Sequence, residues 1–586
     1  MSFKFETPSL GINPQEVKLY ACDPRDGAQD PKSPIDTVER KLLLVQTLAD
    51  SRIPFSHFEL GYAGSGSGMD SEIWREAQQN LRTDVWERCT AFASSRMNKS
   101  ASAEDDPFMR ALVEAGTRAA TIFVKSDTLQ VAEVLKVSNE RNLELIRESV
   151  AFLAQQGKEV IVDLEHFFQG YMHNAQYARQ CIMAAIDKGA TTIVGCDTNG
   201  LASPAFVKAV VEHLFNPENT DGLASHMKSV KFGLHLHNDG SAATRSLLEG
   251  LQTGHVKHLQ GNLVAAGERT GNDSFVDLFG AAYNECGADF LPPEAWQRLR
   301  SVSQRVSKLL TGSWIDDKTP FVGGDAFTHS AGMHTKSLSR SGESYDPCPF
   351  HGGPSLRSKM NVPFRYALGP QSGTENIGHY LAPEAFGIEH DCNGQVGECL
   401  NLVKNPDGIN YTQAWGSAGL AFYRHMKDPE SLFEVVSQEG HYEISLLTGG
   451  TVKSQADAGV IVQLPDQTTV EAAEHHPHGM VNGLANSLRE ALKTTYPCLE
   501  HLELVDYESK SLEGGTGANV VTYITLRSRN TGDLWATAVT GENVIQTAFE
   551  AISEGFKYWI HAHRGDFSHY QDTNLLEKYR PRGDLT

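Results

Sequence analysis

The first 290 residues of the chain alternate between short apolar runs and longer stretches with helical spacing. Each apolar run is rich in β-branched or aromatic residues, and a polar break separates it from the stretch that follows. The runs that predict strands are residues 17–23, 55–61, 88–94, 119–125, 159–165, 191–197, 231–237 and 257–263. This repetition predicts βα units, and eight units are the number that a closed (β/α)8 barrel requires.

The stretch 141–157 illustrates the predicted helices. Its residues Leu145, Val150 and Leu153 recur on one helical face, and Gly157 ends the pattern. We expect this apolar face to cover the barrel wall. A doubly wound open sheet uses the same alternation of strands and helices, so the count of units favours the barrel only modestly.

Polar residues near the ends of the predicted strands favour the barrel more strongly. In six of the units, unusual polar groups fall at or just beyond the carboxyl end of the strand. These residues are Arg25, Asp26, Glu59, Glu165, Asp197, Thr198, His235, His237 and Glu268. Because (β/α)8 barrels carry their chemistry at that end, the pattern predicts an α/β barrel with its site at the mouth.

The pattern changes beyond residue 300. A Gly-, Pro- and Ser-rich segment follows, and from Tyr442 the chain alternates in strand fashion around a helix predicted near 479–493. We expect a barrel over 1–295, a linker subdomain over 296–440, an α+β domain over 441–565 and a tail over 566–586. The sequence EHHPH at 474–478 is interpreted as a solvated loop.

Composition excludes several classes of function. The chain has 586 residues, and its 51 Lys and Arg against 73 Asp and Glu give a net charge of -22, which disfavours binding to nucleic acid or to an anionic membrane. No signal-peptide pattern and no long apolar run is present, so we expect a cytoplasmic protein. Nine cysteines without a CxxC pair indicate reduced thiols.

Three residues form a candidate metal site. His235 and His237 alternate on one predicted strand, so both imidazoles point to the same face, and two imidazoles suit a divalent cation. Asp26, after the first strand, can reach the same barrel mouth and add a carboxylate. Taken separately, HxHND is equally compatible with two hydrogen-bonded histidines, and RDGAQ with an ordinary Asp-Gly turn; the combination favours the metal.

Two further carboxylates are candidates for supporting roles. Glu268 lies in GERTGN (267–272), where it can orient a metal-bound imidazole or simply start a helix. Glu165 follows the apolar run VIVDLE, and an apolar setting would suit a general base. A simple ion pair explains Glu165 equally well.

These motifs resemble those of a known family, the metal-dependent barrels that contain 2-isopropylmalate, homocitrate and citramalate synthases. RDGAQ (25–29) resembles the family's RDGxQ, HLHND (235–239) its HxHND, and GERTGN (267–272) its GERxGN. FVGGDAFTHSAGMH (321–334) resembles the linker that bears a catalytic histidine. EVIVDLEHFFQGY and CDTNG are closest to long-form citramalate synthase, and the C-terminal part resembles that family's regulatory domain, which binds an amino-acid effector and helps to form a homodimer.

The resemblance implies a role for each matched residue. Asp26, His235 and His237 would bind a divalent metal (Mg, Mn or Zn), with Asn272 as a fourth or near ligand. Arg25 would stabilise developing negative charge, and Glu165, His334 and Tyr345 would take part in proton transfers. Gln29 and Thr198 would hold the carboxylate of a small 2-oxo acid, with Glu59, Val124 and Gln130 also in the substrate pocket. The implied reaction is a Claisen condensation of acetyl-CoA with the 2-oxo acid, pyruvate being the first expectation.

The first strand departs from the family pattern. The family reads DTTLRDG where this chain reads ACDPRDG, which places Asp23 and Pro24 just before the motif. Asp23 would add negative charge beside Asp26, and Pro24 would remove a backbone donor. Val124 and Gln130 replace an expected Gly and His, which favours altered substrate choice. The alternatives are therefore the same chemistry on another 2-oxo acid, a retro-aldol lyase, or an inactive metabolite-binding relative.

Overall fold

The computed structural model describes most of the chain in two compact units. The described residues are 8–64, 69–219, 222–346, 349, 351–362, 364–380, 393–404, 408–411, 413–426, 431–446, 452–476, 479–512, 519–528 and 534–563. The first unit comprises the described residues of Met1–Ala326 and Asp346–Pro363, and the second those of Phe327–Tyr345 and Phe364–Thr586. The segment 296–440, expected to form one linker, is thus divided between the units.

The first unit is a closed barrel of eight parallel strands in chain order, which confirms the predicted fold class. The strands are β1 Lys18–Ala21, β2 Phe55–Tyr62, β3 Cys89–Ser94, β4 Ala119–Lys125, β5 Glu159–Glu165, β6 Thr192–Asp197, β7 Lys231–Leu236 and β8 Val256–Gly261. Each lies on one of the runs predicted from the sequence. β8 pairs with β1 through Leu19 opposite Leu259, which closes the ring.

Side chains from alternate strand positions fill the inside of the barrel. Tyr20 and Cys22 at β1 pack there with Ile161 of β5 and with Val194 and Cys196 of β6. All five are buried, between 0% and 6% exposed. The barrel therefore has a solid interior, and a ligand can approach only at an end.

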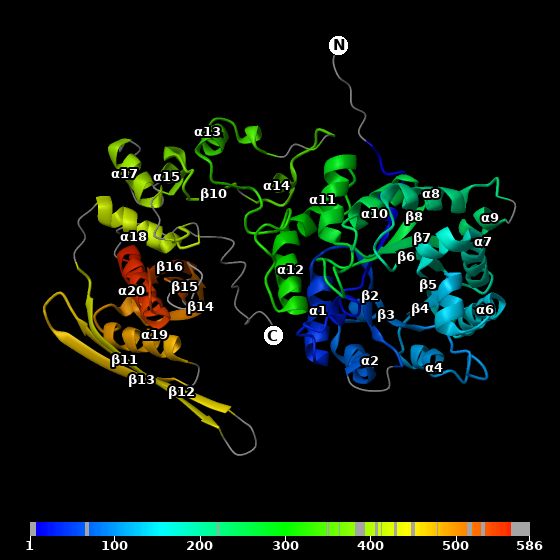
Figure 1. Cartoon of the computed structure of the whole chain (residues 1–586), viewed down its shortest axis with the longest axis horizontal. Helices are drawn as coiled ribbons and strands as arrows, with labels where there is room; N and C mark the ends of the chain where they lie inside the picture. Colours follow the sequence, from blue (N-terminus) through cyan, green and yellow to red (C-terminus); the bar gives the residue numbers. More distant parts are fainter. Residues whose placement is uncertain are drawn as a thin grey trace, which may run out of the picture. The chain divides into compact units, whose positions relative to one another are not determined.

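Helices surround these strands, as Figure 1 shows. They are α1 Val38–Asp50, α2 Met69–Asn80, α3 Thr83–Trp86, α4 Pro107–Glu114, α5 Thr128–Gln130, α6 Asn139–Gln155, α7 Phe167–Ile186, α8 Pro204–Phe215, α9 Leu223–Met227, α10 Ala243–Gln252, α11 Phe275–Cys286, α12 Pro293–Thr311 and α14 Leu356–Lys359, with short turns η1 Pro14–Glu16, η2 Gly27–Gln29 and the π-helical η3 Val131–Leu135. In α6 the Ser138 hydroxyl accepts from the Arg141 N–H, and Leu145, Val150 and Leu153 are buried, as their spacing predicts.

The second unit contains two three-stranded antiparallel sheets, each followed by a helix. The first sheet has β11 Glu434–Leu446, β12 Val452–Gln463 and β13 Thr469–His476 and precedes α19 Met480–Leu492; the second has β14 Leu502–Ser511, β15 Val520–Ser528 and β16 Leu534–Gly541 and precedes α20 Val544–His563. Smaller elements are β9 Thr328–His329, β10 Arg365–Tyr366, α13 Gly332–Arg340, α15 Thr374–Tyr380, α17 Asn393–Lys404, α18 Trp415–Met426, η4 Gly342–Ser344 and η5 Pro497–Leu499. Trp535 stacks on Trp559 at 4.4 Å in the shared core.

The interpretation of 474–478 as a loop is wrong for its described part. β13 continues to His476, and the His475 imidazole lies 2.5 Å from an Asp457 carboxylate oxygen on β12. Cross-strand pairing of Asp457 with His475 explains why this polar sequence stays in the sheet. Residues 477–478 lie outside the described residues.

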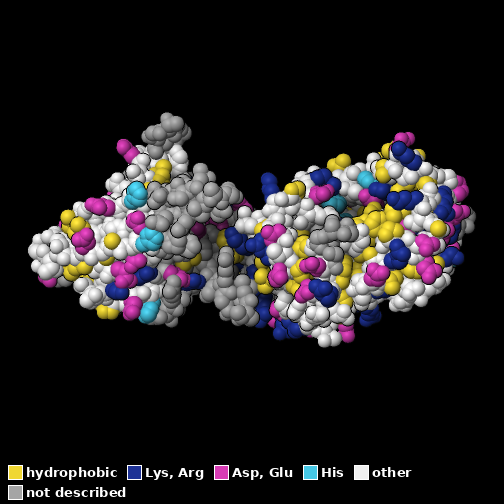
Figure 2. Space-filling view, turned by 90° about the horizontal axis from the view of Figure 1, so that it is seen from below, with side chains coloured by type: hydrophobic (Ala, Val, Ile, Leu, Met, Phe, Trp, Pro, Cys, Tyr) yellow, Lys and Arg dark blue, Asp and Glu magenta, His cyan; other side chains and the backbone are white. Residues whose placement is uncertain are grey.

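Within the described ranges, no helix combines the length and apolar character that a membrane span requires. Figure 2 shows acidic and basic side chains interspersed over the visible face, with hydrophobic side chains gathered between them on the barrel unit. Several large exposed hydrophobic residues follow the carboxyl ends of β4, β5 and β6, namely Leu129, Val134, Leu135, Met172 and Leu201. Apolar surface therefore lies on the same side of the barrel as the candidate site.

Candidate metal centre

Asp26 is held at the end of β1 by a tight turn. The backbone N–H groups of Arg25, Asp26 and Gly27 all donate to the Cys22 carbonyl, at 3.1, 2.9 and 3.2 Å. Pro24 lies inside this turn, and its missing N–H removes none of these three bonds. The Asp26 backbone is therefore fixed although a proline precedes Arg25.

His235, His237 and Asn272 are brought together by backbone pairing between the end of β7 and the loop after β8. His237 and Asn272 form an isolated bridge, and the Asp273 N–H donates to the Leu236 carbonyl at 3.0 Å. From this position the Asn272 amide donates to an Asp26 carboxylate oxygen at 2.8 Å. Three separate segments thus meet at one point of the barrel mouth.

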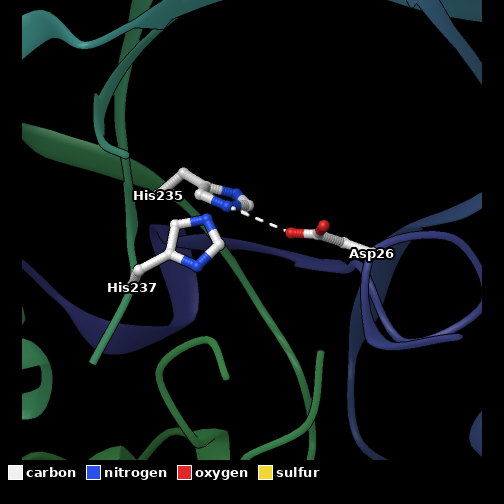
Figure 3. A group of neighbouring side chains, drawn as sticks. All are labelled: Asp26, His235 and His237. Atoms are coloured by element: carbon white, nitrogen blue, oxygen red, sulfur yellow. Dashed lines mark ion pairs between the residues drawn. The ribbon is translucent and has the colours of Figure 1, made fainter. Parts of the chain in front are cut away.

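Asp26, His235 and His237 form a compact cluster. Each contributes one potential ligand atom, and these atoms lie within 4.8 Å of one another. Figure 3 shows both imidazoles pointing toward the carboxylate, and His235 Nε2 lies 3.4 Å from Asp26 Oδ2. Asp26 and His235 are each 6% exposed. The spatial grouping predicted from the sequence is therefore present.

Two buried polar atoms beside this cluster fit a divalent cation. Among the described residues, neither His237 Nδ1 nor Asn272 Oδ1 has a hydrogen-bond partner. Buried polar atoms normally have a partner, and both of these atoms carry lone pairs that a cation accepts. A carboxylate, two imidazoles and an amide oxygen are suitable ligands for Mg, Mn or Zn.

The electrostatics of the cluster also suit a cation. Burial acts to raise the pKa of Asp26, but Arg25 and the imidazoles outweigh it and hold this pKa well below its usual value. Burial acts to lower the pKa of His235, whereas the bond to Asp26 raises it, and the net pKa is raised. Burial and His235 lower the pKa of His237 to about 4. At neutral pH an anionic oxygen and a neutral His237 imidazole therefore lie side by side.

The hydrogen-bond partner of the His235 imidazole is Gln260, and the supporting role of Glu268 stays a prediction. His235 Nδ1 lies 3.0 Å from Gln260 Oε1, and Gln260 Nε2 donates to Asp163 at 2.9 Å. Glu268 is exposed, and no contact in the described part of the chain joins it to an imidazole. The only available sequence signal was a Gln and an Asp at inward positions of two apolar strands, β8 and β5.

Arg25 lies between two carboxylates and an aromatic ring. Its side chain pairs with Glu59 and with Asp26, at 3.2 Å for Asp26, and its guanidinium lies 3.8 Å from the centre of the Phe92 ring. Glu59 is fully buried and its other oxygen accepts from Tyr20 at 2.7 Å. Both carboxylate oxygens of Glu59 are engaged within the barrel, where Glu59 holds Arg25 in place. A contact between Glu59 and the substrate stays a prediction.

Glu165 ends β5 at the same side of the barrel. Its carboxylate lies 2.5 Å from Lys125 Nζ at the end of β4. The neighbouring His166 has a left-handed backbone, with φ 57°, and its N–H donates to the Thr198 hydroxyl at 2.8 Å. Of the two interpretations left open, the structure favours the ion pair for Glu165.

Thr198 and Gln29 follow the ends of β6 and β1. Thr198 is partly exposed, and the Arg269 guanidinium donates to its carbonyl at 2.7 Å. Arg269 also pairs with Asp239 of the HLHND segment at 2.9 Å. Gln29 is exposed at the end of η2. Both predicted carboxylate-binding residues thus lie on loops at the site end of the barrel.

Val124 does not fit its predicted place in the pocket. Its neighbour Phe123 stacks on Phe92 at 5.5 Å, beneath Arg25, and so faces the interior. Because side chains alternate along a strand, Val124 faces the surrounding helices and is buried there. Gln130 is partly buried at the end of α5, before η3, and its role stays a prediction.

His334 and Tyr345 lie together in the second unit. His334 is exposed on α13, and its ring stacks on Tyr345 with centroids 4.3 Å apart. His329 lies edge-on to Tyr345 at 5.4 Å. The two residues predicted to assist each other in proton transfer are therefore neighbours.

Asp23 is turned away from the cluster. Its carboxylate is fully buried and accepts from the Leu263 N–H at 2.9 Å. Burial, only partly offset by this bond, raises the pKa of Asp23 to about 7. Asp23 therefore ties β1 to the loop after β8, and the effect of its charge on Asp26 stays a prediction.

Known proteins match both units of the chain. Residues 16–306 match the HMGL-like family, and residues 426–560 match the LeuA allosteric (dimerisation) domain. The (R)-citramalate synthase of Synechocystis sp. is 30% identical over 545 residues, covering 92% of this chain and 96% of the relative. That of Aquifex aeolicus is 28% identical over 552 residues, covering 93% and 98%. A solved HMG-CoA lyase from Bacillus subtilis is 16% identical, with a TM-score of 0.41, covering 52% of this chain and 97% of that one.

The HMGL-like match over residues 16–306 includes Asp26, His235 and His237, and the similarity to the Synechocystis synthase covers 92% of this chain. The chain therefore belongs to the family that contains the (R)-citramalate synthases.

Proposed function

We propose that this protein condenses acetyl-CoA with a small 2-oxo acid, pyruvate first, to give citramalate and free CoA. The observation that carries the proposal is the buried Asp26, His235 and His237 cluster at the barrel mouth. The family relationship supports the choice of reaction, because the relatives named above are (R)-citramalate synthases that match nearly the whole chain.

Asp26, His235 and His237 would hold a divalent cation, with Asn272 as the fourth or a neighbouring ligand. A bound cation would polarise the carbonyl of the 2-oxo acid, which makes its carbon electrophilic. The Asn272 amide already donates to Asp26, so it also keeps that carboxylate oriented. Carboxylate, imidazole and amide ligands accept Mg, Mn or Zn, and we propose no choice among them.

Arg25 stabilises the negative charge that develops on oxygen during condensation. Glu59 and Asp26 fix its guanidinium, and the Phe92 ring supports it from one side. A donor that is already oriented before the reaction needs no reorganisation in the transition state. Thr198 and Gln29, on the loops after β6 and β1, would hold the carboxylate of the 2-oxo acid.

Glu165 and His334 take part in the proton transfers, with Tyr345 against His334 as an assistant. A base removes a proton from the methyl group of acetyl-CoA, and the resulting carbanion forms a bond to the carbonyl carbon of the 2-oxo acid. The carbonyl π bond breaks as this bond forms, and its oxygen takes up a proton to become the hydroxyl group of the product. Water then cleaves the thioester, and the CoA sulfur leaves as a thiol. Lys125, paired with Glu165 at 2.5 Å, holds this carboxylate in place at the end of β5.

The C-terminal match to a domain described as allosteric and dimerising supports a homodimer. We propose that the second unit forms the contact between two copies and is the place where an amino-acid effector acts. The domain match and the antiparallel sheets β11–β13 and β14–β16 support this assignment.

Thiol release from acetyl-CoA tests the function directly. The purified chain is assayed with Mg or Mn, with and without pyruvate, and with a chelator as control. Release that requires both pyruvate and metal supports citramalate formation. Release only with larger 2-oxo acids assigns the same chemistry to another substrate. No release with any 2-oxo acid in a metal-loaded protein rejects the proposal and favours a metabolite-binding relative.

A further inference from the structure

His235, a candidate metal ligand, has a buried hydrogen-bond partner on the side away from Asp26, and this partner is bonded in turn to a second buried residue. His235 Nδ1, on β7, lies 3.0 Å from Gln260 Oε1, on β8. Gln260 Nε2 in turn donates to Asp163 Oδ1, on β5, at 2.9 Å. Gln260 is 0% exposed and Asp163 is 4% exposed. A continuous chain of side chains therefore crosses the barrel interior and ends on the imidazole.

The structure has one orientation of the amide: the Gln260 NH2 group faces Asp163, and the amide oxygen faces His235. An ionised Asp163 carboxylate, which only accepts hydrogen bonds, fits this orientation. An amide oxygen only accepts, so the hydrogen of a neutral His235 must be on Nδ1. The lone pair is then on Nε2, the nitrogen that lies 3.4 Å from Asp26.

A reversed amide would have the opposite effect. Its NH2 group would face His235 Nδ1, which would then need a lone pair, and the hydrogen would move to Nε2. An imidazole in that tautomer has no lone pair to offer to a cation beside Asp26. The choice between a binding and a non-binding His235 therefore depends on which way one amide points.

We propose that Asp163 and Gln260 are positioning residues that hold His235 in the tautomer able to bind a divalent cation through Nε2. This inference rests on the metal site of the proposed function. Asp163 acts indirectly: it orients the amide of Gln260, and Gln260 orients the His235 imidazole. Neither residue touches substrate in this arrangement.

The second imidazole provides an internal contrast. His237 Nδ1 has no hydrogen-bond partner among the described residues. His235 Nδ1 thus has a hydrogen-bond partner on the side away from Asp26, whereas His237 Nδ1 has none among the described residues. Loss of the Gln260 amide should weaken the contribution of His235 and leave that of His237 unchanged.

Titration of Mn²⁺ into the full-length protein without substrates tests the proposal. Gln260→Leu should weaken Mn²⁺ binding by about 10- to 100-fold, the usual effect of removing a group that supports a ligand. Gln260→Glu keeps an acceptor for His235 Nδ1 and should restore most of the affinity. Ser149→Ala is the matched control, because the Ser149 hydroxyl is a buried hydrogen-bonding group on α6 that does not contact His235, Gln260 or Asp163. The Mn²⁺ affinity of Ser149→Ala should equal that of the wild type.

A double-variant cycle tests whether the two residues act in series. Asp163→Leu should weaken Mn²⁺ binding, and adding it to Gln260→Leu should cause little further loss. The proposal is overturned if the two losses of Mn²⁺ affinity multiply in the double variant. It is also overturned if Gln260→Leu binds Mn²⁺ with wild-type affinity. If circular dichroism shows that Gln260→Leu does not fold, Gln260→Met is compared with Gln260→Glu instead. Equal Mn²⁺ affinities in those two variants would also overturn the proposal.

The outcome is independent of the proposed reaction. If Mn²⁺ binding depends on Gln260 but no 2-oxo acid causes thiol release, the positioning role stands and the function is wrong. If pyruvate-dependent release occurs but Gln260→Leu binds Mn²⁺ like the wild type, the function stands and the positioning role is wrong.

Discussion

The barrel mouth and helix α13 carry candidate groups for the same reaction in opposite settings. Asp26, His235 and Asn272 are buried, and each has a hydrogen-bonding or ionic partner. His334 and Tyr345 are exposed, and their described contacts are ring stacking. The difference follows the chemistry: ligands of a cation must be held in place before it binds, whereas a group that moves a proton must be able to approach and leave.

The largest expected effect is at the buried cluster of the barrel mouth. His235→Ala removes one imidazole, and we expect CoA release to fall by at least about 1000-fold, because several kcal/mol of charge stabilisation depend on the cation. Mn²⁺ affinity, measured by titration calorimetry, should fall in parallel. His226→Ala, at an exposed histidine on α9, is the control; unchanged CoA release in His235→Ala would reject the site.

Substitution of the exposed His334 should affect turnover but not metal binding. His334→Gln should lower kcat by about 100-fold, as expected for a lost proton-transfer group, and should leave Mn²⁺ affinity unchanged. Steady-state thiol release and Mn²⁺ titration on the same preparation separate these two effects. His329→Gln, at a neighbouring ring of the same group, should lower kcat much less. Equal losses of kcat in His334→Gln and His329→Gln would contradict a proton-transfer role for His334.

The sequence predicted the barrel and its metal cluster because both follow from local patterns. All eight strand runs were visible as short apolar segments, and His-x-His on one strand places two imidazoles on one face. Asp26 could be added because the carboxyl ends of parallel barrel strands meet at one mouth.

The sequence could not predict side-chain direction or distant partners. Glu59 pairs with Arg25, and Asp23 accepts from the backbone of Leu263, 240 positions away. Val124 faces outward and its neighbour Phe123 faces inward, because side chains alternate along β4. Gln260 stayed unrecognised because its partners, His235 and Asp163, come from two other strands.

A smaller effect should be confined to the second unit. Trp535 is fully buried, and its indole N–H donates to the Gly555 carbonyl at 2.9 Å. Trp535→Phe removes this donor and should lower the free energy of unfolding by about 2 kcal/mol. Chemical denaturation followed by fluorescence measures the loss, while Mn²⁺ affinity should stay unchanged. A fall in metal affinity would mean that the cluster depends on the packing of this core.

The last expected effect, which is the smallest only when counted per pH unit, is the pH dependence of stability caused by Asp23. Its pKa of about 7 in the folded chain is above the ordinary value near 4, so between these pH values the folded state keeps a proton that the unfolded state loses. The free energy of unfolding should therefore decrease as pH rises through this window, by at most about 1.4 kcal/mol per pH unit from this group.

Asp23→Asn should make that pH profile less steep, as measured by urea denaturation between pH 4 and 8. The exposed Asp187, replaced by Asn, provides the control and should leave the profile unchanged. A wild-type slope in Asp23→Asn would show that Asp23 is ionised throughout.

The bond between Asn272 and Asp26 joins residues 246 positions apart in the chain. It can form only after the eighth strand has closed the ring against the first, so a growing polypeptide on the ribosome cannot assemble this cluster before almost the whole barrel has emerged. A cation that binds this cluster only in the closed barrel would stabilise the closed form by mass action.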